Sequence, residues 1–600
     1  MTNRLERHDR ITKLRSKPIP LDDDEITGLL DDLNASGIVE ELAPLIDHDK
    51  GRPRHLTLTG LLLGMFLAAA RNAGTVTMTT VADILAFRIS EPLRAEFGIP
   101  HYPDNDQGFE AFYAVVRRLF HRVREAVDPS PLPKNHRLDK DEAARLQAEA
   151  DPEALASKRG RLLSIANRIL GMSLRQAHEL LENSTWTGDY AVDATVIGTY
   201  AKGLPNKSEV TSTDPEAGWY MRTRRHKDPL ALNHLDPTNN IKTKGKKGMP
   251  PSPQEQIVKA LFGYDATLII ARDPEHDGAP LSDGSADPEV IPALVVAFSV
   301  EKPSTRPAEV ALEALNHIDP RHPRGYLAGD RLYNDQQAEN FQLPIRAMGF
   351  KPVYDYAKDQ LGSMDEYEGA QLVEGNWYCP SMPEHLVDAT ADLIAGRVDK
   401  QTWIERTRQR TQYLFLPKQA ADAEGHRRMM CPAQAGRVQC PLKPHTMGKG
   451  VHITLVDVPP SPVEPHSVCK NGSVTFPPEA GAQLWQPLQH GREDWQRIYF
   501  RLRNSVEGVN GFGKDPLYEH FESGGTRRIR GIAAQTLLLA FQLGHANRRK
   551  LTAWADAIAL NGDRPRRRPT RRRKTKPLGA WTPKGYLTKT DNKTETEPDQ

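Results

Sequence analysis

The hydrophobic pattern divides the chain into a helical first part and a second part that begins with strands. Residues 1–182 carry apolar residues at helical spacing, and their longest apolar run is GLLLGMFLAAA at 60–70. The segment 56–88 predicts two helices joined by a turn at Gly74. This arrangement is typical of a DNA-binding helix-turn-helix, but also of an ordinary helical pair. The charged, proline-containing segment 127–160 predicts a linker or an exposed helix.

The pattern changes near residue 187, where short runs rich in Val and Ile begin. They predict three strands, a helix and two further strands, in this order: Tyr190–Ile197, 263–273, 293–302, 307–318, 323–335 and 344–356. This succession predicts an α/β fold with a mixed sheet and helices.

A segment rich in Pro and Gly then interrupts the alternation of strands and helices. It contains short β-like runs such as QYLFLP and HITLVDVP, so we expect a β-rich insertion. Helical character returns at 491 and includes an apolar helix at 531–551. The chain is therefore predicted to contain a helical region, a core in two parts around the insertion, and a tail: 1–182, 183–357 with 491–550, 358–490, and 551–600.

Charge is balanced over the whole chain but concentrated at one end. The 600 residues include 80 basic and 78 acidic ones, a net charge of +2. Residues 564–576, RPRRRPTRRRKTK, nevertheless hold nine Arg or Lys and no acid. Such a tail favours binding to nucleic acid, although a merely solubilising tail has the same composition. The arginines that we expect to contact DNA are Arg566, Arg567, Arg568, Arg571, Arg572 and Arg573.

The first residues of the chain and the length of its longest apolar run indicate where in the cell the protein is expected. The chain opens with the polar sequence MTNRLERHDR, and its longest apolar run is too short to span a bilayer. We therefore expect a cytoplasmic protein with no signal peptide and no membrane contact.

Four cysteines lie in the insertion, which is too few for a disulfide scaffold in a chain of this length. Four thiolates could hold a structural zinc ion and help a proline-rich segment to fold. The spacing does not match a CxxC ribbon, so four unlinked cysteines are the alternative. The candidate ligands are Cys379, Cys431, Cys440 and Cys469.

Three carboxylates are candidates for a metal site. Asp193 lies inside the apolar run YAVDATVI, and Asp330 ends the fourth strand in LAGDRLYN. We expect these two strands to be neighbours, and Glu507 from a later helix could complete the cluster. Three carboxylates suit Mg²⁺ or Mn²⁺, and two such ions can cleave a phosphodiester.

Each of these carboxylates also has a structural interpretation. Asp189 competes with Asp193 as the first acid of the cluster. Asp193 could pair with an arginine, Asp330 with its neighbour Arg331, and Glu507 with Arg503 one helical turn away.

The stretch FRLRNSVEGVNGFGK at 500–514 places four side chains on one helical face. Phe500, Arg503, Glu507 and Lys514 fall within a stripe roughly 60° wide if the helix continues to Lys514. Three glycines in the stretch weaken that helix.

Together these motifs resemble those of bacterial insertion-sequence DDE transposases marked by a Tyr-x2-Arg-x3-Glu-x6-Lys signature. Here the signature reads F-x2-R-x3-E-x6-K, and GDRLYND resembles the family motif around the second Asp. The resemblance covers about 187–357 and 491–548. Phe500 stands where the family has Tyr, so a hydrogen bond from that hydroxyl to a phosphate is lost while stacking on a base or sugar is retained.

The resemblance implies an RNase H-like fold in which Asp193, Asp330 and Glu507 bind two Mg²⁺ or Mn²⁺ ions. It also implies that Arg503 and Lys514 contact DNA phosphates beside the cleaved end. Some relatives hold a flipped base on an aromatic of the insertion, for which Trp377, Trp403 and Trp485 are available here, with core packing as the alternative.

The predicted function is that of a transposase that binds terminal inverted repeats, cleaves the transposon ends and joins them to target DNA. Two ends must be held together, so we expect a homodimer on DNA. The alternatives are an RNase H-like nuclease without strand joining and an inactive DNA-binding derivative.

Overall fold

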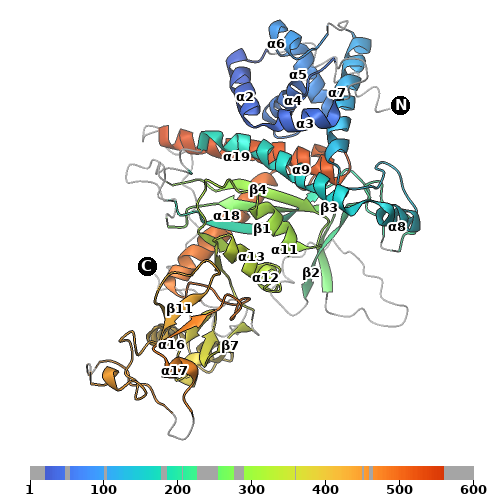
Figure 1. Cartoon of the computed structure of the whole chain (residues 1–600). Coiled ribbons are helices and arrows are strands. Elements are labelled where there is room, and N and C mark those ends of the chain that lie inside the picture. Colours follow the sequence, from blue (N-terminus) through green and yellow to red (C-terminus); the bar gives the residue numbers. More distant parts are fainter. Residues whose placement is uncertain are drawn as a thin grey trace, which may run out of the picture.

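The computed structural model places an N-terminal group of helices, a central sheet with helices and a smaller third unit (Figure 1). The residues that it describes are 20–47, 55–100, 105–177, 181, 186–205, 207–225, 255–275, 290–357, 360–448, 450, 452–458 and 464–559.

The first part of the chain is helical, as its pattern predicts. The two helices expected in 56–88 are present, and each begins at a threonine cap: Thr57 accepts from the Gly60 amide and Thr77 from the Thr80 amide. The apolar run 60–70 lies in the first of them, which is buried along nearly its whole length. The helices are α2 Asp23–Ala35, α3 Ile38–Ile46, α4 Leu58–Arg71, α5 Met78–Phe87, α6 Glu91–Glu96, α7 Asp106–Val127, α8 Lys140–Glu149 and α9 Pro152–Gly171.

The central sheet is mixed, which confirms the predicted α/β class. Its strands are β1 Tyr190–Gly198, β2 Gly218–Arg225, β3 Glu255–Ala271, β4 Leu294–Glu301, β5 Tyr326–Ala328 and β6 Lys351–Val353. Along its main part the order is β4–β3–β1–β5–β6, and β2 pairs with the first half of β3. β3 is antiparallel to β1 and β4, whereas β5 is parallel to both β1 and β6.

Three details of the sheet differ from the sequence prediction. The predicted strand 323–335 is a strand only at β5, because a short helix begins directly after Asp330. β2 was not expected. The segment 344–356 is not one strand, because it begins inside helix α13 (Gln342–Ala347) before β6. Pro344 is compatible with that helix because it lies in the first turn, where no intrahelical N–H bond is lost.

Alternation along β1 decides which face each side chain meets. Tyr190 and Val192 belong to the core beneath helix α11 (Pro307–Leu315). Ala191 and Ile197 belong to the opposite core, with helices α18 (Glu493–Gly513) and α19 (Ile532–Ala559). That second core continues without a break into α2–α7.

Two asparagines cover the outer edge of the sheet. The Asn167 side chain of α9 accepts from the Phe298 amide at 2.9 Å and donates to the Phe298 carbonyl at 3.0 Å. Asn547 of α19 does the same at Val295, at 3.0 and 2.8 Å. Strand β4 therefore has partners for these backbone groups on its outer side, which an edge strand ordinarily exposes.

The short helix α12 (Arg331–Asn334) follows β5, and the insertion between β6 and α18 has a core of its own. Its described residues form two three-stranded sheets, so β structure is present as predicted, but they also form four short α-helices. Within the described part of HITLVDVP, Leu455 forms only an isolated bridge to Gln439. The elements are β7 Ser363–Tyr367, β8 Ala370–Val373, β9 Asn376–Tyr378, α14 Glu384–Val387, α15 Ala389–Ile394, α16 Lys400–Gln409, β10 Leu416–Pro417, β11 Arg427–Met430, α17 Ser467–Lys470 and β12 Ser473–Phe476.

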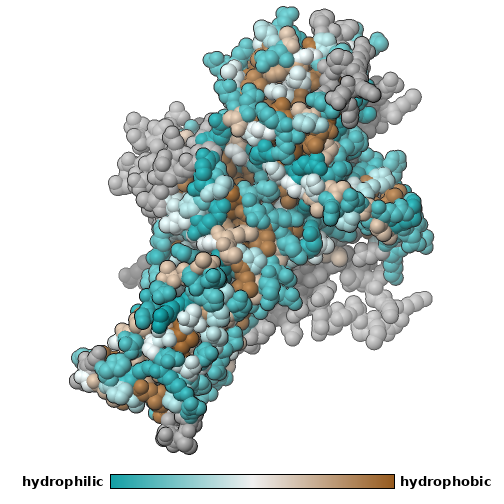
Figure 2. Space-filling view, in the orientation of Figure 1, coloured by the Kyte–Doolittle hydropathy of each residue, from teal (hydrophilic) through white to brown (hydrophobic). Residues whose placement is uncertain are grey.

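The surface seen in Figure 2 is mostly hydrophilic, with smaller apolar patches on the N-terminal helices, the centre and the insertion. None of the helices in the described ranges has both the length and the apolar character of a membrane span.

Candidate active site

Strand register brings Asp193 and Asp330 together. The parallel strands β1 and β5 pair Ala191 with Ala328. Asp193 and Asp330 each follow two residues later, so they stand side by side and on the face that Ala191 shares. Asp330 lies just past the end of β5, where its Oδ1 caps α12 by accepting from the Leu332 amide at 3.0 Å.

Burial and three neighbouring charges act on the pKa of Asp193. Burial raises the pKa of Asp193 to about 6, against the opposing pull of Arg503. The negative charge of Asp330 adds to the rise, and Lys514 opposes it. Two carboxylates, an arginine and a lysine therefore share one electrostatic environment.

Arg503 of α18 reaches Asp193 without a hydrogen bond. Its Nη1 lies 3.7 Å from Asp193 Oδ2, and both side chains are about four-fifths buried, with 18% and 19% exposed. The same Nη1 is buried and makes no hydrogen bond among the described residues. This donor is therefore available to a further acceptor at the site.

Glu507 lies one turn beyond Arg503 on the same side of α18, and it is exposed. Residues four apart on a helix have Cβ atoms about 6 Å apart. The carboxylate oxygens of Asp193, Asp330 and Glu507 do not all lie within 4.8 Å of one another in the described structure. The structure thus brings the two aspartates together and leaves Glu507 beside them at the surface.

The predicted helix through 500–514 is continuous to Gly513, with Lys514 as its C-cap. Gly513 serves packing, because a Cβ there would lie 2.0 Å from the Phe521 ring. Phe500 is half-buried against the core and contacts the Trp495 and Tyr499 rings, both at 5.6 Å.

Lys514 belongs to an ion-pair cluster that the sequence did not indicate. Its Nζ lies 3.1 Å from Glu522 Oε1, and Lys259 Nζ reaches the same oxygen at 2.5 Å. Glu522 is held against the end of β1, where a Cβ on Gly198 would lie 2.2 Å from the Glu522 carbonyl oxygen. The lysines come from β3 and the end of α18, so only the tertiary fold joins them.

Asp189, the competing first carboxylate, has a structural role. It is buried, its Oδ1 accepts from the Tyr326 amide at 2.6 Å, and its Oδ2 accepts from the Thr187 hydroxyl at 2.7 Å. These bonds tie the start of β1 to β5 and set the register that aligns Asp193 with Asp330.

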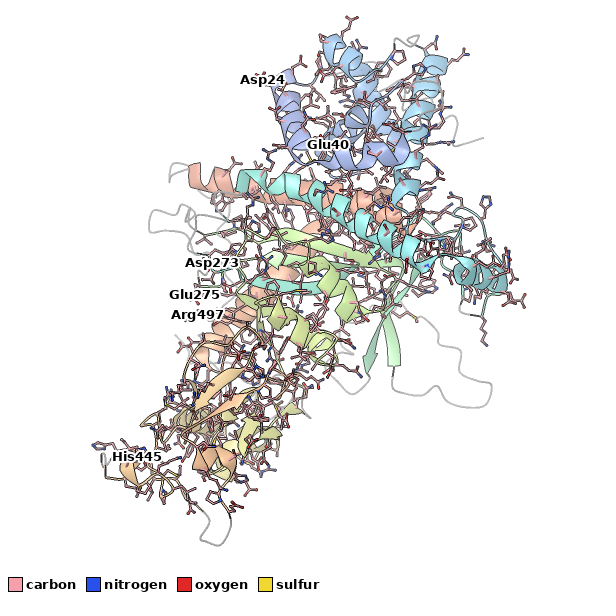
Figure 3. All side chains as sticks on the ribbon, viewed as in Figure 1. Asp24, Glu40, Asp273, Glu275, His445 and Arg497 are labelled. Atoms are coloured by element: carbon pink, nitrogen blue, oxygen red, sulfur yellow. The ribbon has the colours of Figure 1, made fainter. Side chains whose placement is uncertain are left out.

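The start of α18 is anchored to the segment that follows β3. Arg497 Nε lies 3.1 Å from Glu275 Oε2, and Figure 3 shows the two side chains close together. Arg501 donates to the carbonyls of Pro274 and Glu275 at 2.6 and 2.7 Å. These contacts fix the position of the helix that carries Arg503 and Glu507.

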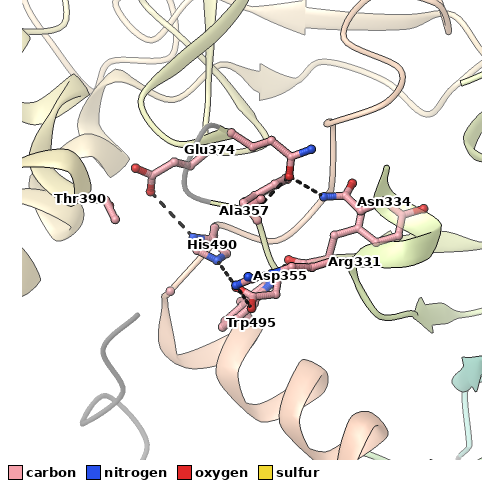
Figure 4. Close-up of polar contacts among 12 residues, drawn as sticks. Arg331, Asn334, Asp355, Ala357, Glu374, Thr390, His490 and Trp495 are labelled. Atoms are coloured by element: carbon pink, nitrogen blue, oxygen red, sulfur yellow. Dashed lines mark hydrogen bonds and ion pairs between the residues drawn. The ribbon is translucent and has the colours of Figure 1, made fainter. Parts of the chain in front are cut away.

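A charged network begins at Arg331, the residue after Asp330 in the chain, and becomes buried at His490 and Glu374 (Figure 4). Arg331 pairs with Asp355 at 3.0 Å, so the suggested pairing of Arg331 with Asp330 is not the one formed. His490 lies 3.3 Å from Asp355 and 3.8 Å from Glu374, which in turn pairs with Arg410 at 2.7 Å. The network joins the turn after Asp330 to the core of the insertion.

The four cysteines meet in that core although they come from four separate segments. Cys379, Cys431 and Cys440 are buried there, and Cys469 packs against them. Burial raises the pKa of Cys379 to about 12, and the nearness of Cys431, Cys469 and Cys440 adds to the rise. All four are free thiols.

Other predicted residues have different environments. Trp377, Trp403 and Trp485 are each 9% exposed or less and pack in the insertion, so core packing is their role in this structure. The tail arginines Arg566, Arg567, Arg568, Arg571, Arg572 and Arg573 lie outside the described residues.

The described residues contain one group of three side chains whose ligand atoms all lie within 4.8 Å, namely Asp422, Glu424 and His426. This group sits between β10 and β11, and two of its members are exposed. It is separate in the chain from every residue predicted to bind metal.

Comparisons with protein-family models, with curated proteins and with solved structures gave no match.

Proposed function

We propose that this protein is a DDE transposase that cleaves transposon ends and joins them to target DNA. The observation that carries the proposal is the register of β1 and β5, which aligns Asp193 with Asp330 beneath Arg503. The strand order β4–β3–β1–β5–β6 supports an RNase H-like core, because it makes the strands carrying the first two acids neighbours.

The donor set fits a divalent cation. Asp193 and Asp330 are acidic and lie side by side. Burial is the main cause of the raised pKa of Asp193, and the negative charge of Asp330 adds to it. They would hold the ion, and Glu507 is the proposed third ligand. Bound Mg²⁺ or Mn²⁺, as one ion or two, supplies activation of water or of a 3′-hydroxyl and stabilises the leaving oxygen.

The chain's own cations would bind and orient the DNA strand. Arg503 has a buried Nη1 that makes no hydrogen bond within the described structure, so it can donate to a phosphate oxygen. Lys514 is close enough to Asp193 to act on its pKa, and it would exchange its contact with Glu522 for a phosphate. Phe500, which lacks a hydroxyl, can contribute only apolar contact.

DNA would also contact the protein away from this site. The N-terminal helices would read the inverted repeats, and the basic tail would add affinity that does not depend on sequence. Two ends must be joined in one reaction, so the active form would be a homodimer on DNA.

We also propose that Cys379, Cys431, Cys440 and Cys469 hold a structural zinc ion. The four cysteines come from four segments and meet at one core, which supports this proposal. They form no disulfide there, so their thiols are free to bind a metal ion. In a tetrahedral site with Zn–S near 2.3 Å the sulfurs lie about 3.8 Å apart. No three of them lie within 4.8 Å in the described structure, so zinc would draw them closer.

The transposase proposal is tested with purified protein, Mg²⁺ and a plasmid that carries the DNA flanking the gene. Wild type is expected to cleave the ends, and Asp330→Asn to lose about 100-fold or more in rate. Asp335→Asn removes an exposed acid nearby and should cleave like wild type.

The products separate the proposal from its alternatives. Ends joined covalently to target DNA support transposition, whereas cleavage without joining indicates a nuclease. Binding without cleavage, in Mg²⁺ and again in Mn²⁺, would leave only the inactive DNA-binding derivative.

A further inference from the structure

A large cavity lies where the N-terminal helices meet the sheet-bearing core. Its volume is ≈ 830 Å³, within the usual range for ligand sites. It is lined by the first turn of α5, by one side of α7 and by residues 528–530 before α19. No residue of the candidate active site lines it.

The cavity is strongly basic. One acidic side chain, Asp83, lines it, and that carboxylate is paired with Arg88 at 2.9 Å. Arg71 is paired with Glu25. Arg117, Arg528 and Arg530 have no carboxylate partner among the described residues. The arginines lining the cavity are Arg71, Arg88, Arg117, Arg124, Arg528 and Arg530.

A buried donor and a helix end also line the cavity. Arg124 is 7% exposed, and its Nε makes no hydrogen bond in the described structure. Its Nη2 lies 2.8 Å from His121 Nε2 and 3.8 Å from Glu125 Oε1, a carboxylate that does not line the cavity. An unsatisfied buried donor is costly unless a ligand supplies an acceptor. Thr77, Met78, Thr79 and Thr80 form the positive end of the ten-residue helix α5. The lining is thus complementary to an anion.

The cavity is connected to the candidate active site through β1. Arg530 Nε donates to the Tyr200 carbonyl at 2.9 Å, and the Arg528 guanidinium lies 5.7 Å from the Tyr200 ring centre. Tyr200 follows Asp193 by seven residues, so at most about 25 Å of chain separates them. Successive phosphates of one DNA strand are about 3.4 Å apart along the helix axis. One duplex could therefore reach both places, with at most about seven nucleotides between Asp193 and Tyr200.

We propose that this cavity binds a backbone phosphate of the DNA duplex whose end lies at the active site. The anion chemistry follows from the arginines, Arg124 and α5 alone. The choice of DNA as the source of the phosphate rests on the proposed function.

The test measures binding of a fluorescent DNA duplex to the full-length protein over a series of salt concentrations. Arg117→Gln with Arg528→Gln removes two exposed charges from the cavity. The matched control is Arg118→Gln with Arg122→Gln, which removes two other arginines of α7 that are exposed and outside the lining. Each lost phosphate contact lowers the slope of log K against log salt by about 0.9. The double variant should therefore bind the duplex about tenfold or more weakly than wild type. The magnitude of its salt slope should fall by up to about 2, and that of the control should fall by less.

The outcomes are distinct from those of the cleavage assay. A double variant with the affinity and slope of the control overturns the proposal. Thermal stabilisation of wild type by inorganic pyrophosphate, lost in the double variant while duplex binding is unchanged, would assign the cavity to small phosphates and also overturn it. Duplex binding that depends on these arginines supports it even if the protein never cleaves DNA.

Discussion

His490 is buried between two carboxylates, and their charges decide its protonation. Burial alone would lower the pKa of His490, but Asp355 and Glu374 outweigh it and raise that pKa. Burial opposes ionisation of Glu374 as well, yet Arg410 and His490 hold its pKa well below the usual range. The imidazolium is thus part of the link between the insertion and the turn after Asp330.

This link predicts a pH-dependent stability. A histidine whose pKa is raised by folding stabilises the folded state. This stabilisation is complete below about pH 6.5, the ordinary pKa of histidine, and it is lost as the pH rises through the raised pKa. The free energy of unfolding of wild type should therefore exceed that of His490→Gln most at about pH 6, and the difference should shrink toward about pH 9. Urea unfolding at a series of pH values measures it.

The exposed His445 of the same insertion provides the control for that measurement. His445→Gln should show no comparable trend with pH. A difference between wild type and His490→Gln that stays constant over this range would show that His490 is neutral in the folded protein.

Single residues also show what the sequence could and could not indicate. Asp193 was identifiable because an acid inside an apolar strand demands a partner. The choice between Asp193 and Asp189 required the structure, since both lie near the same strand and only hydrogen bonds to Tyr326 and Thr187 reveal the structural one. The ion pair of Lys259 with Glu522 could not be predicted, because no local pattern links residues so far apart in the chain.

At the scale of elements, the edge of β4 depends on two helices from distant parts of the chain, α9 and α19, which pack against each other. Asn547 supplies both partners for the Val295 backbone, and no neighbouring strand replaces it. Removing the amide leaves a buried N–H and a buried carbonyl without these bonds. Each unsatisfied group costs about 1–3 kcal/mol.

Asn547→Ala is therefore expected to lower the free energy of unfolding by about 2–6 kcal/mol. The variant should also aggregate more readily, because an open strand edge can pair with another chain. Thr552→Ala, at an exposed position of the same helix, should change stability by less than about 0.5 kcal/mol. Equal unfolding midpoints for the two variants would show that the asparagine contributes little.

Helices and strands with regularly spaced apolar residues could be predicted from the sequence, and short elements could not. The strands at 190–197 and 293–302 and the helices at 307–318 and 531–551 follow from apolar spacing. The segment 344–356 was misassigned because a short helix and a three-residue strand share one apolar run. The glycines of α18 did not break it, because tertiary packing outweighs their low helix propensity.

At the scale of the whole molecule, the insertion is the unit that a metal ion would stabilise. The segment is proline-rich, its core is small, and three of the four thiols are buried in that core with Cys469 packed against it. If zinc binds there, purified protein should contain about one zinc per chain. Chelation, or Cys440→Ser, should then make 358–490 sensitive to proteolysis while the central sheet stays folded.

Zinc content by elemental analysis and the pattern of proteolytic fragments measure this prediction. A matched variant is Met447→Ser, which alters an exposed apolar residue of the insertion outside the thiol group. Protein that contains no zinc and resists proteolysis equally with and without chelator would show that apolar packing alone holds the insertion.

The cover of β4 by Asn547 has a consequence for the order of events during synthesis. Val295 and Asn547 are 252 residues apart in the chain. A ribosome adds about 5–20 residues per second, so the strand waits roughly 10–50 seconds for the helix that covers it. During that interval the nascent chain carries an open sheet edge, and a chain that terminates before α19 never closes it. Premature termination in this region would therefore yield a product prone to associate with other chains, with or without the residues of the active site.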